Sequence, residues 1–372
     1  MSNFKKNSEK GELLKKTRLI IWDEVPMQHR FAAEAIDRTL RDFLDQPNLP
    51  FGGITVAFGG DFQQILPVVV KGTKEDIIGA CIQRSFLWRH IKVLHLTQNM
   101  RVDSRDAQSV EFARWLLDVG QGKDLPLNHF FTLPQHMLCG PDISDLVQAI
   151  YADILDRRPL TDEYFLERAI LCPRNVEVDE INSLIYEQFP GEGRVYSSAD
   201  SVQNSEEDFQ YPVEYLNSIN FGGFPLSQLQ VKRGVPLMLL RNLDPGLGLC
   251  NGTRLRLLNM TTRVLHVNIV TGPCAGEHAF IPRITLTSSD ELPFELHRRQ
   301  FPVRLAFAMT INKAQGQSLG MVGLDLCDPV FAHGQFYVGV SRGRNWSKVK
   351  VLLRESRETT NIVYKDVLLR PT

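Results

Sequence analysis

Short apolar runs alternate with amphipathic stretches in the first part of the chain. The runs Leu19–Trp22, Ile54–Phe58 and Val93–Leu96 each end in polar or charged residues, as buried parallel strands do. Apolar residues recur at helical spacing over 31–44 and again over 107–119, so we predict a helix in each range. Strands that alternate with helices predict an α/β fold, in which ligands gather at the carboxyl ends of parallel strands.

The same pattern starts again further along the chain. A strand is predicted at Ala169–Cys172, and Val178, Ile181 and Ile185 then lie on one face of a helix. Residues 190–230 show little periodicity and contain many Gly, Ser, Asn, Asp and Glu residues. We therefore predict a long excursion there, without regular elements.

Short β-strands replace this pattern between about residues 231 and 302. Turn residues, among them the hairpin signal Asn251-Gly252, separate the strands. The predicted strands are Val235–Leu240, Arg254–Leu258, Val264–Val270 and Ala279–Ile284. We predict a small β-barrel inserted in a second α/β domain. The pattern of that domain resumes at 303–309, 321–326 and 348–353.

Composition restricts the class of protein only weakly. With 43% hydrophobic and 23% charged residues, the chain of 372 residues resembles ordinary globular proteins of two or three domains. No apolar run approaches the roughly 20 residues that cross a bilayer, and the first residues lack the apolar core of a secretory signal. We expect a nuclear protein, with the mitochondrion and the cytoplasm as alternatives.

The six cysteines lie far apart and form no CxxC pair. This spacing argues against a zinc site and against a disulfide framework, and it predicts reduced, mostly buried thiols. The cysteines are Cys81, Cys139, Cys172, Cys250, Cys274 and Cys327.

Charge is unevenly distributed, although the net charge is −1. The segment Val231–Thr372 contains 19 Lys and Arg residues against 10 Asp and Glu residues, whereas the preceding residues contain 23 basic and 33 acidic ones. A basic C-terminal part favours a polyanionic partner, although a solvated charged surface would give the same counts.

Two predicted strand ends carry residues that suit nucleotide hydrolysis. Asp23 and Glu24 follow the first strand, where an Asp binds Mg²⁺ through its water shell and an adjacent Glu orients and deprotonates an attacking water. Gly60, Asp61 and Gln64 follow the second strand, where glycine permits tight backbone geometry and the Gln amide is able to contact a γ-phosphate. The alternative is a pair of charged turns without a catalytic role.

Seven segments in a fixed order resemble the motifs of Pif1-like superfamily 1B DNA helicases. Asp23-Glu24 and GDFQQILPV at 60–68 resemble helicase motifs II and III. The other matching segments are LTQNMR at 96–101, CPRNVEVDEIN at 172–182, GVPLMLLRNLD at 234–244 with GLCNGTRL at 248–255, AFAMTINKAQGQSL at 306–319 and FAHGQFYVGVSR at 331–342. The segment FPVRLAFAMTINKAQGQS is most similar to the Helitron-type branch.

The resemblance implies catalytic roles for five residues. Asp23 and Glu24 would bind Mg²⁺ and activate water. Gln64 would contact the terminal phosphate of ATP. Arg101 and Arg342 would neutralise charge on the transferred phosphoryl group, because a guanidinium presents a planar fork to phosphate oxygens.

The resemblance also implies a nucleotide cleft and a path for DNA. The cleft would include Gly60, Asp61, Gln315 and Gly316. Contacts to single-stranded DNA would come from Thr310, Asn312 and Lys313. For His333 and Tyr337 two interpretations remain: a role in the site, or packing in the core.

We expect single-strand binding to reside in residues 231–372 and to weaken with salt. Phe307 or Tyr337 would stack on bases if they face the groove rather than the core. Further basic residues near the DNA-coupling motifs are Arg344, Lys348 and Lys350.

The resemblance implies tandem RecA-like parallel sheets, the first of them truncated, with a small SH3-like β-barrel inserted in the second. The domains would be 1–160, 161–230 together with 303–372, and the insertion 231–302. The implied function is an ATP-dependent 5′–3′ DNA helicase that couples Mg-ATP hydrolysis to translocation on single-stranded DNA, in DNA repair, recombination and telomere maintenance. Its partners would be ATP, Mg²⁺ and single-stranded and duplex DNA, with no membrane and no obligate protein partner.

One motif of the family has no counterpart in the sequence. The phosphate-binding loop GxxxxGK[ST] lies well upstream of the strand that ends at Asp23, and only 22 residues precede Asp23. The single Gly-Lys pair, Gly122-Lys123, precedes Asp124 and does not form this loop. We therefore expect impaired ATP hydrolysis. The alternative is a non-catalytic helicase fragment or transposon relic that at most binds single-stranded DNA.

A metal nuclease built on the carboxylates is disfavoured. The acidic residues of a nuclease converge on one or two metal ions. The resemblance to the helicase family implies instead that these acidic residues lie along an ATP cleft.

Overall fold

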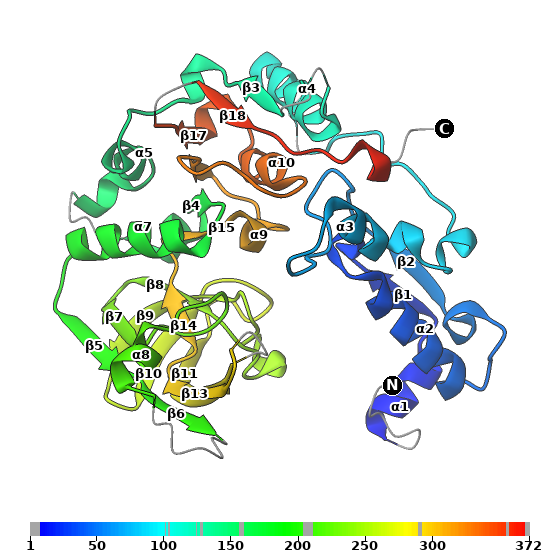
Figure 1. Cartoon of the computed structure of the whole chain (residues 1–372), viewed down its shortest axis with the longest axis horizontal. Helices are drawn as coiled ribbons and strands as arrows, with labels where there is room; N and C mark the ends of the chain where they lie inside the picture. Colours follow the sequence, from blue (N-terminus) through cyan, green and yellow to red (C-terminus); the bar gives the residue numbers. More distant parts are fainter. Residues whose placement is uncertain are drawn as a thin grey trace. The chain divides into compact units, whose positions relative to one another are not determined.

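Packing divides the chain into two compact units (Figure 1). The computed structural model describes residues 8–100, 102, 105–123, 125–126, 129–155, 160–203, 211–288, 292–354 and 357–368. Unit 1 contains 1–132, 330–345 and 358–372, and unit 2 contains 133–329 and 346–357. Segments 330–345 and 358–372 therefore pack in unit 1 and not with the rest of the predicted second domain. Packing units need not coincide with the domains of a family, so the predicted domain boundaries stay a prediction.

A pair of parallel strands forms the sheet of unit 1. β1 (Leu19–Trp22) pairs with β2 (Thr55–Phe58) along its whole length. Helix α2 (Arg30–Phe43) buries Ala33 and Leu40 in the core cluster that also receives one face of these strands. The two strands and the helix that periodicity predicted are confirmed.

The third strand predicted for this sheet, Val93–Leu96, is not formed. Residues 91–99 have no regular secondary structure, and the side chains of Leu94 and Leu96 are 78% and 101% exposed. A strand is stable in a sheet only when its N–H and C=O groups pair with a neighbour. Within the described part of unit 1, the parallel sheet consists of β1 and β2, and this run pairs with neither. The prediction was wrong because apolar side chains do not supply a hydrogen-bonding edge.

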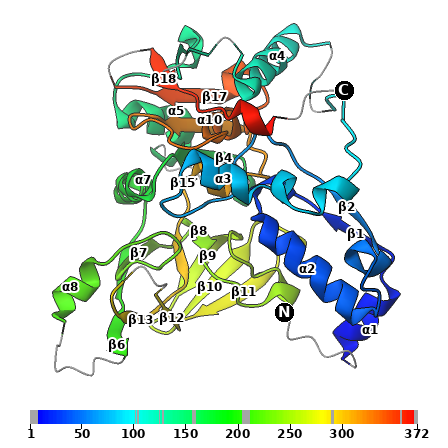
Figure 2. The same ribbon diagram turned by 45° about the vertical axis from the view of Figure 1, so that its right-hand side comes forward.

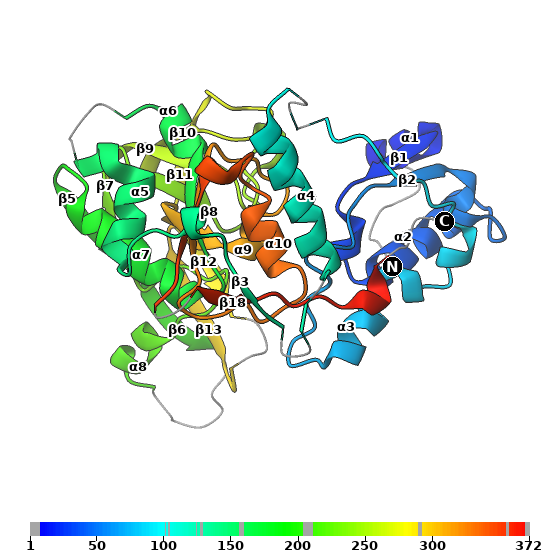
Figure 3. The ribbon, with the colours of Figure 1, turned by 90° about the horizontal axis from the view of Figure 1, so that it is seen from above.

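Helices α4 (Ala107–Gln121) and α10 (Gln335–Val340) lie side by side in unit 1 (Figure 3). Phe336 packs edge-on against Trp115, with ring centroids 6.3 Å apart. The side chain of Asp106 caps the first turn of α4, where the first N–H groups lack helical partners. The helix predicted at 107–119 is confirmed.

Short elements complete the described part of unit 1. β3 and β18, which periodicity did not predict, pair in an antiparallel fashion. These elements are α1 (Glu9–Lys16), η1 (Val25–Met27), η2 (Pro50–Gly53), α3 (Lys74–Ala80), η3 (Ile82–Arg84), η4 (Trp88–His90), β3 (Phe130–Thr132), β18 (Glu358–Thr360) and η8 (Lys365–Val367).

Unit 2 contains a four-stranded parallel sheet that confirms the α/β prediction. Helices α5 (Ile143–Leu155) and α7 (Asn175–Gln188) pack on it (Figure 1). The strands, in spatial order, are β15 (Ala308–Thr310), β4 (Arg168–Cys172), β16 (Met321–Asp325) and β17 (Val349–Leu352). Short helices in this unit are η5 (Gln135–Met137), α6 (Asp162–Leu166), α8 (Val213–Ser218), η6 (Pro245–Leu247), α9 (Ile311–Ala314) and η7 (Trp346–Lys348).

Antiparallel strands make up the rest of unit 2, including the five-stranded sheet of Figure 2. Its order is β11 (His278–Pro282), β10 (Val264–Ile269), β9 (Arg254–Met260), β8 (Pro236–Leu239) and β14 (Val303–Leu305). The smaller sheets are β12 (Ile284–Thr287) with β13 (Glu295–Gln300) and β6 (Ala199–Gln203), and β5 (Gly193–Ser197) with β7 (Gln228–Lys232). The SH3-like character of this region stays a prediction.

The excursion predicted at 190–230 is more regular than expected, because it contains β5, β6, α8 and most of β7. β6 pairs with β13, about a hundred residues later in the chain. Hydrogen bonds to so distant a partner stabilise a strand whose own sequence shows no clear alternation. The prediction of an excursion without regular elements was therefore wrong.

The single strand predicted at 303–309 is two strands, β14 and β15, in two different sheets. Between the two strands the backbone changes its hydrogen-bond partners. The Ala306 N–H donates to Pro236 O at 3.0 Å, and Phe307 O accepts from the Tyr151 hydroxyl at 2.7 Å. An apolar run does not reveal where its backbone changes partner.

A buried arginine ties the three-stranded sheet to α8. Arg298 is fully buried and forms an ion pair with the buried side chain of Asp200, with Nη2 2.7 Å from Oδ2. The same guanidinium donates to the carbonyls of Leu216, Ile219 and Pro225. All of its charge is therefore satisfied inside the protein, as a buried ion requires.

Asp200→Ala tests this contribution. We expect the free energy of unfolding to fall by about 3–5 kcal/mol, because the substitution leaves the Arg298 charge buried without a counterion. Urea denaturation followed by circular dichroism measures the change. Arg299→Ala is the control, since Arg299 is the exposed neighbour on the same strand. Equal effects of the two substitutions would contradict this assignment.

Candidate nucleotide and nucleic-acid sites

The strand ends of unit 1 bring the predicted carboxylates together. Asp23 and Glu24 follow β1, and Gly60 and Asp61 follow β2, so parallel pairing places both segments at one edge of the sheet. Two backbone hydrogen bonds extend the pairing past the strands: Gly59 N–H donates to Trp22 O at 2.8 Å, and Val25 N–H donates to Gly59 O at 3.0 Å. The arrangement predicted from the sequence is thus present.

Close packing around Asp23 requires glycine at its neighbours. Asp23 Oδ1 accepts a hydrogen bond from the Glu24 N–H at 2.9 Å. A Cβ atom at Gly59 would lie 2.8 Å from the same oxygen, and one at Gly60 would lie 2.1 Å from Pro26 Cδ. Gly60 also has a φ of +154°, which favours glycine. Gly60 is among the residues predicted for the site, whereas Gly59, which precedes it at the same strand end, is not.

Glu24 has a strained backbone. Its φ of +53° lies in the left-handed region, which costs a residue with a Cβ on the order of 1–3 kcal/mol. Such strain persists where the surrounding structure enforces it and concentrates at functional sites. The observation therefore supports a functional role for the Asp23–Glu24 turn.

The donor set at this edge fits Mg²⁺ held together with a nucleotide. Asp23, Glu24 and Asp61 supply carboxylate oxygens, the ligand type that Mg²⁺ prefers. In the described part of the chain no three His, Cys, Asp or Glu residues form a metal-binding group. Mg²⁺ at nucleotide sites needs only one or two carboxylates, with water and phosphate as its other ligands.

Gln64 places an unsatisfied acceptor in the loop that follows β2. The backbone N–H of Gln64 donates to Asp61 O at 3.2 Å. Asp61 Oδ1 accepts from the backbone N–H of Gln63 at 2.8 Å, and the two bonds close a tight turn. The side-chain oxygen of Gln64 is buried and has no hydrogen-bond partner among the described residues. A buried unsatisfied polar atom is uncommon, and a bound group or water supplies the partner in many such cases.

His333 and Gly334 support this loop from the segment before α10. His333 Nε2 donates to Phe62 O at 2.8 Å, and Nδ1 accepts from the Tyr364 N–H at 2.8 Å. A Cβ atom at Gly334 would lie 2.5 Å from the carbonyl carbon of Gln64. His333 is 2% exposed, so this residue, which the sequence left open, packs in the core and orients the loop.

Burial keeps His333 neutral at pH 7. Its pKa is lowered to about 4, because burial penalises the imidazolium and outweighs the opposing hydrogen bond to Phe62. The neutral ring, with its proton on Nε2, is the form that makes both hydrogen bonds.

Of the two predicted catalytic arginines, Arg342 lies in the described part of unit 1 and Arg101 lies outside the described residues. Arg342 follows α10 and is 5% exposed. Its Nε donates to Val338 O at 3.0 Å and its Nη2 to Ser341 Oγ at 2.9 Å. These bonds fix the guanidinium against the end of α10.

The predicted DNA-coupling residues lie in unit 2, around α9. Thr310 ends β15 and directly precedes α9, Asn312 and Lys313 lie within α9, and Gln315 and Gly316 follow it. Gly316 has a φ of +77°, so glycine suits this position.

Lys313 is a partly buried cation near two arginines. Its pKa is lowered by burial and by Arg304 and Arg241, and only Asp179 raises it. Among the described residues its ammonium group has no hydrogen-bond or ion-pair partner. Neither Arg241 nor Arg304 is among the residues predicted for this site. Arg241 lies 72 residues before Lys313 along the chain, whereas Arg304 lies nine residues before it, on β14.

Phe307 does not face a groove. It is fully buried and packs against Tyr151 and Phe189, with centroid distances of 5.9 and 5.7 Å. The condition set for its stacking on bases is therefore not met, because the residue fills the core between β15 and the surrounding helices. Tyr337 is half-buried and lies against Gly120 of α4.

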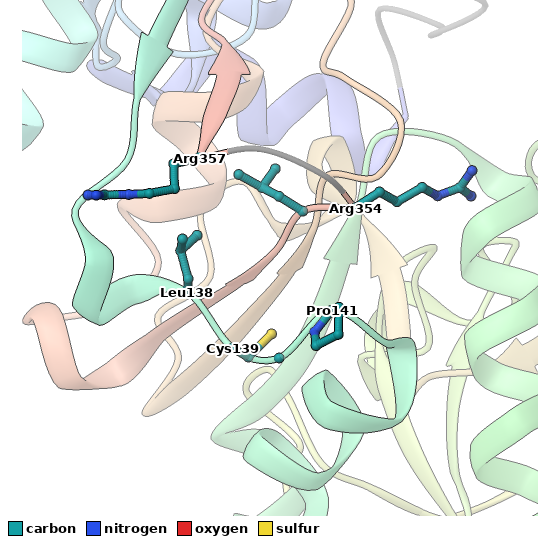
Figure 4. Close-up of a pocket in the computed structure, with 7 residues that line it drawn as sticks. Leu138, Cys139, Pro141, Arg354 and Arg357 are labelled. Carbon is teal, nitrogen blue, oxygen red and sulfur yellow. The ribbon is translucent and has the colours of Figure 1, made fainter.

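A surface cavity of about 410 Å³ lies elsewhere in unit 2 (Figure 4). No predicted site residue lines it, and the side chains of Arg354 and Arg357 extend in opposite directions. Burial raises the pKa of the Cys139 thiol there to about 11, so this cysteine is protonated and unreactive at neutral pH.

The prediction of free thiols is confirmed, since no cysteine forms a disulfide. The prediction that they are mostly buried is wrong for four of the six: only Cys81 and Cys172 are buried. None of the described helices is long and apolar enough to span a membrane.

Two family models match different parts of the chain. A model described as PIF1-like helicase matches residues 1–128, and one described as DNA helicase Pif1, 2B domain, matches residues 214–260. The second match contains β7, β8 and β9.

Curated relatives carry the same family name. The ATP-dependent DNA helicase PIF1 of Xenopus laevis is 28% identical over 327 residues, and that of Danio rerio is 30% identical over 328 residues. Each match covers 86% of this chain and 43% of the relative, so the chain spans less than half the length of these proteins.

A solved structure shares the fold. The Pif1 helicase of Bacteroides, crystallised with ADP-AlF3 and single-stranded DNA, aligns with a TM-score of 0.64 and 22% identity. The alignment covers 100% of this chain and 77% of that one. This likeness supports the tandem α/β architecture.

The neutral state of His333 leads to a pH prediction. Since its pKa is lower in the folded than in the unfolded state, the unfolded state takes up the proton first as the pH falls. The stabilisation is complete above pH 6.5 and is lost progressively down to about pH 4. Over this pH range the free energy of unfolding falls by about 3 kcal/mol at most.

Urea denaturation between neutral and acidic pH measures this loss. His333→Gln keeps a donor and an acceptor but does not titrate, so we expect a shallower decline of unfolding free energy. His90→Gln, at an exposed histidine of the same unit, is the control. Identical pH profiles for the wild-type and His333→Gln proteins would contradict the assignment.

Proposed function

We propose, from the premise that this chain belongs to the Pif1-like helicase family, that it forms nucleotide- and DNA-handling parts of an ATP-dependent DNA helicase. The observation that carries the proposal is the edge of the β1–β2 sheet, where the Asp23–Glu24 turn meets the Gly59–Asp61 turn. This edge is where parallel α/β sheets bind nucleotides.

Each residue at this edge would have its own role in ATP hydrolysis. Asp23 would hold Mg²⁺ through water, and the ion would neutralise charge on the phosphates. Glu24 would orient the attacking water and accept its proton. Gln64 would contact the terminal phosphate with its amide, and a donor brought by the bound nucleotide or its water would satisfy the buried oxygen. Arg342, with Arg101, would stabilise the transferred phosphoryl group.

Unit 2 would bind single-stranded DNA through Thr310, Asn312 and Lys313. The partly buried ammonium group of Lys313, without an anionic partner of its own, supports a phosphate contact there. The basic balance of Val231–Thr372 supports a polyanionic ligand as well. By resemblance to the family motif, Gln315 and Gly316 would contribute to nucleotide binding.

The finer description rests on the resemblance of the motifs. We propose 5′–3′ polarity, membership of the Helitron-type branch, and roles in DNA repair, recombination and telomere maintenance. A nuclear location is part of the same proposal. A helicase assay on substrates with a 5′ or a 3′ single-stranded tail tests the polarity directly.

ATP hydrolysis stimulated by single-stranded DNA tests the proposed function, measured for the chain joined to a segment that carries the phosphate-binding loop GxxxxGK[ST]. Glu24→Gln removes the base, and we expect a loss of roughly 10²–10⁴-fold in rate. Gly59→Ala adds a methyl group against Asp23 Oδ1, and we expect it to lower the rate and raise the Mg²⁺ concentration required. Gly79→Ala is the matched control, because a Cβ there meets no atom within 4 Å.

The outcomes separate the alternatives. DNA binding without hydrolysis would support a non-catalytic fragment. If the chain neither binds DNA nor hydrolyses ATP, the proposed function is overturned. Equal rates for Glu24→Gln and the wild-type chain would overturn the assignment of this edge.

A further inference from the structure

Arg241 in unit 2 presents an anchored guanidinium with one open edge. Its Nη1 donates to Gly223 O at 2.6 Å and to Leu240 O at 2.9 Å, which uses both protons of that nitrogen. Its Nε and Nη2 have no partner among the described residues, and the side chain is partly exposed. These two nitrogens form the side-on fork that binds two oxygens of one phosphate.

The loop that anchors Arg241 is itself held by Arg304. Arg304 is 7% exposed, and its Nη2 donates to Asn220 Oδ1 at 2.6 Å and to Phe224 O at 2.7 Å. Its Nη1 lies 3.2 Å from Oδ1 of Asp179 on α7. Arg304 therefore fixes the loop 220–224 to the helix beside the parallel sheet, and so it positions Arg241.

This loop also presents an aromatic ring. Phe221 stacks on the buried Phe224, with centroids 4.6 Å apart and an angle of 19° between the rings. Phe221 itself is only partly buried. A rigid aromatic ring with an exposed part is a stacking platform for a base.

The charges of this region are unbalanced. Arg241 and Arg304 both lie close enough to lower the pKa of Lys313, while Asp179 is the acid that raises it. Asp179 is already engaged by Arg304 and by Asn220 Nδ2. Of the charged groups that shift the Lys313 pKa, two are cations and the one carboxylate is already engaged, which favours an anionic ligand at the open fork of Arg241 and at Lys313.

We infer that Arg241 and Phe221 form a nucleotide subsite beside Lys313, in which the Arg241 fork binds a backbone phosphate and Phe221 stacks on the adjacent base. The inference rests on the proposed binding of single-stranded DNA by unit 2 and adds the loop 220–224 to it. An acidic peptide would also satisfy the fork, but the Phe221 ring on the loop that anchors Arg241 favours a ligand that carries a flat base next to each phosphate.

Fluorescence anisotropy with the full chain tests the subsite, using a labelled oligothymidylate and the same strand with abasic residues. Arg241→Gln removes the charge, and we expect weaker binding and a salt slope smaller by about 0.7, one phosphate contact. Phe221→Leu keeps the apolar packing but removes stacking, and we expect about tenfold weaker binding of oligothymidylate with no change for the abasic strand.

Matched controls exclude general effects of charge. Arg263→Gln removes the same charge at an exposed turn of unit 2, and it should leave the salt slope unchanged. Lys313→Ala reports on the proposed DNA site independently of the loop.

Each outcome decides between the two proposals. If the wild-type chain does not bind the strand at low salt, the proposed function fails and the subsite with it. If Lys313→Ala weakens binding while Arg241→Gln and Phe221→Leu do not, only the subsite is overturned. If Phe221→Leu weakens both strands equally, the ring does not stack on a base. If an acidic peptide competes as well as the oligothymidylate, the loop binds peptide instead.

Discussion

Parallel pairing of strands that lie far apart in the sequence is the constraint on which both candidate sites depend. A parallel strand places its carboxyl end beside that of its neighbour, so residues from different segments gather at one edge. In unit 1 the pairing of β1 with β2 brings the Asp23–Glu24 turn to Gly59–Asp61. In unit 2 the pairing of β15 with β4 fixes the strand end from which Thr310 and α9 project. The spacing of side chains at these candidate sites is thus a property of the backbone hydrogen bonds.

Buried arginines join the antiparallel part of unit 2 to its parallel sheet. Arg254 is 2% exposed and donates to the carbonyls of Leu166, Arg168 and Ala306, with no carboxylate among these acceptors. Burial lowers the pKa of Arg254, as desolvation of a cation must. Arg298 and Arg304 make comparable sets of bonds to the loops around α8. A guanidinium has five donors in a rigid plane, so one side chain is able to satisfy several carbonyls from distant segments at once.

The loop that carries Gln64 shows how packing prepares a polar group for a ligand. Gly334 lets the backbone approach closely, and the neutral His333 bonds Phe62 and Tyr364, so the loop has little freedom. A side chain held in place loses less conformational entropy when it meets its ligand. The same reasoning applies to Arg241, whose Nη1 bonds fix the guanidinium while its other edge stays open.

The sequence by itself determined the alternation of strands and helices, the order of the helicase-like motifs and the residues at the ends of β1 and β2. These follow from local periodicity and from side chains adjacent in the chain. Only the tertiary structure decided that Val93–Leu96 stays unpaired, that 303–309 divides between two sheets and that Phe307 belongs to the core. It also decided that Arg241 lies near Lys313. Each of these depends on hydrogen bonds or charges from residues far away in the chain, and a local pattern of polarity does not record such partners.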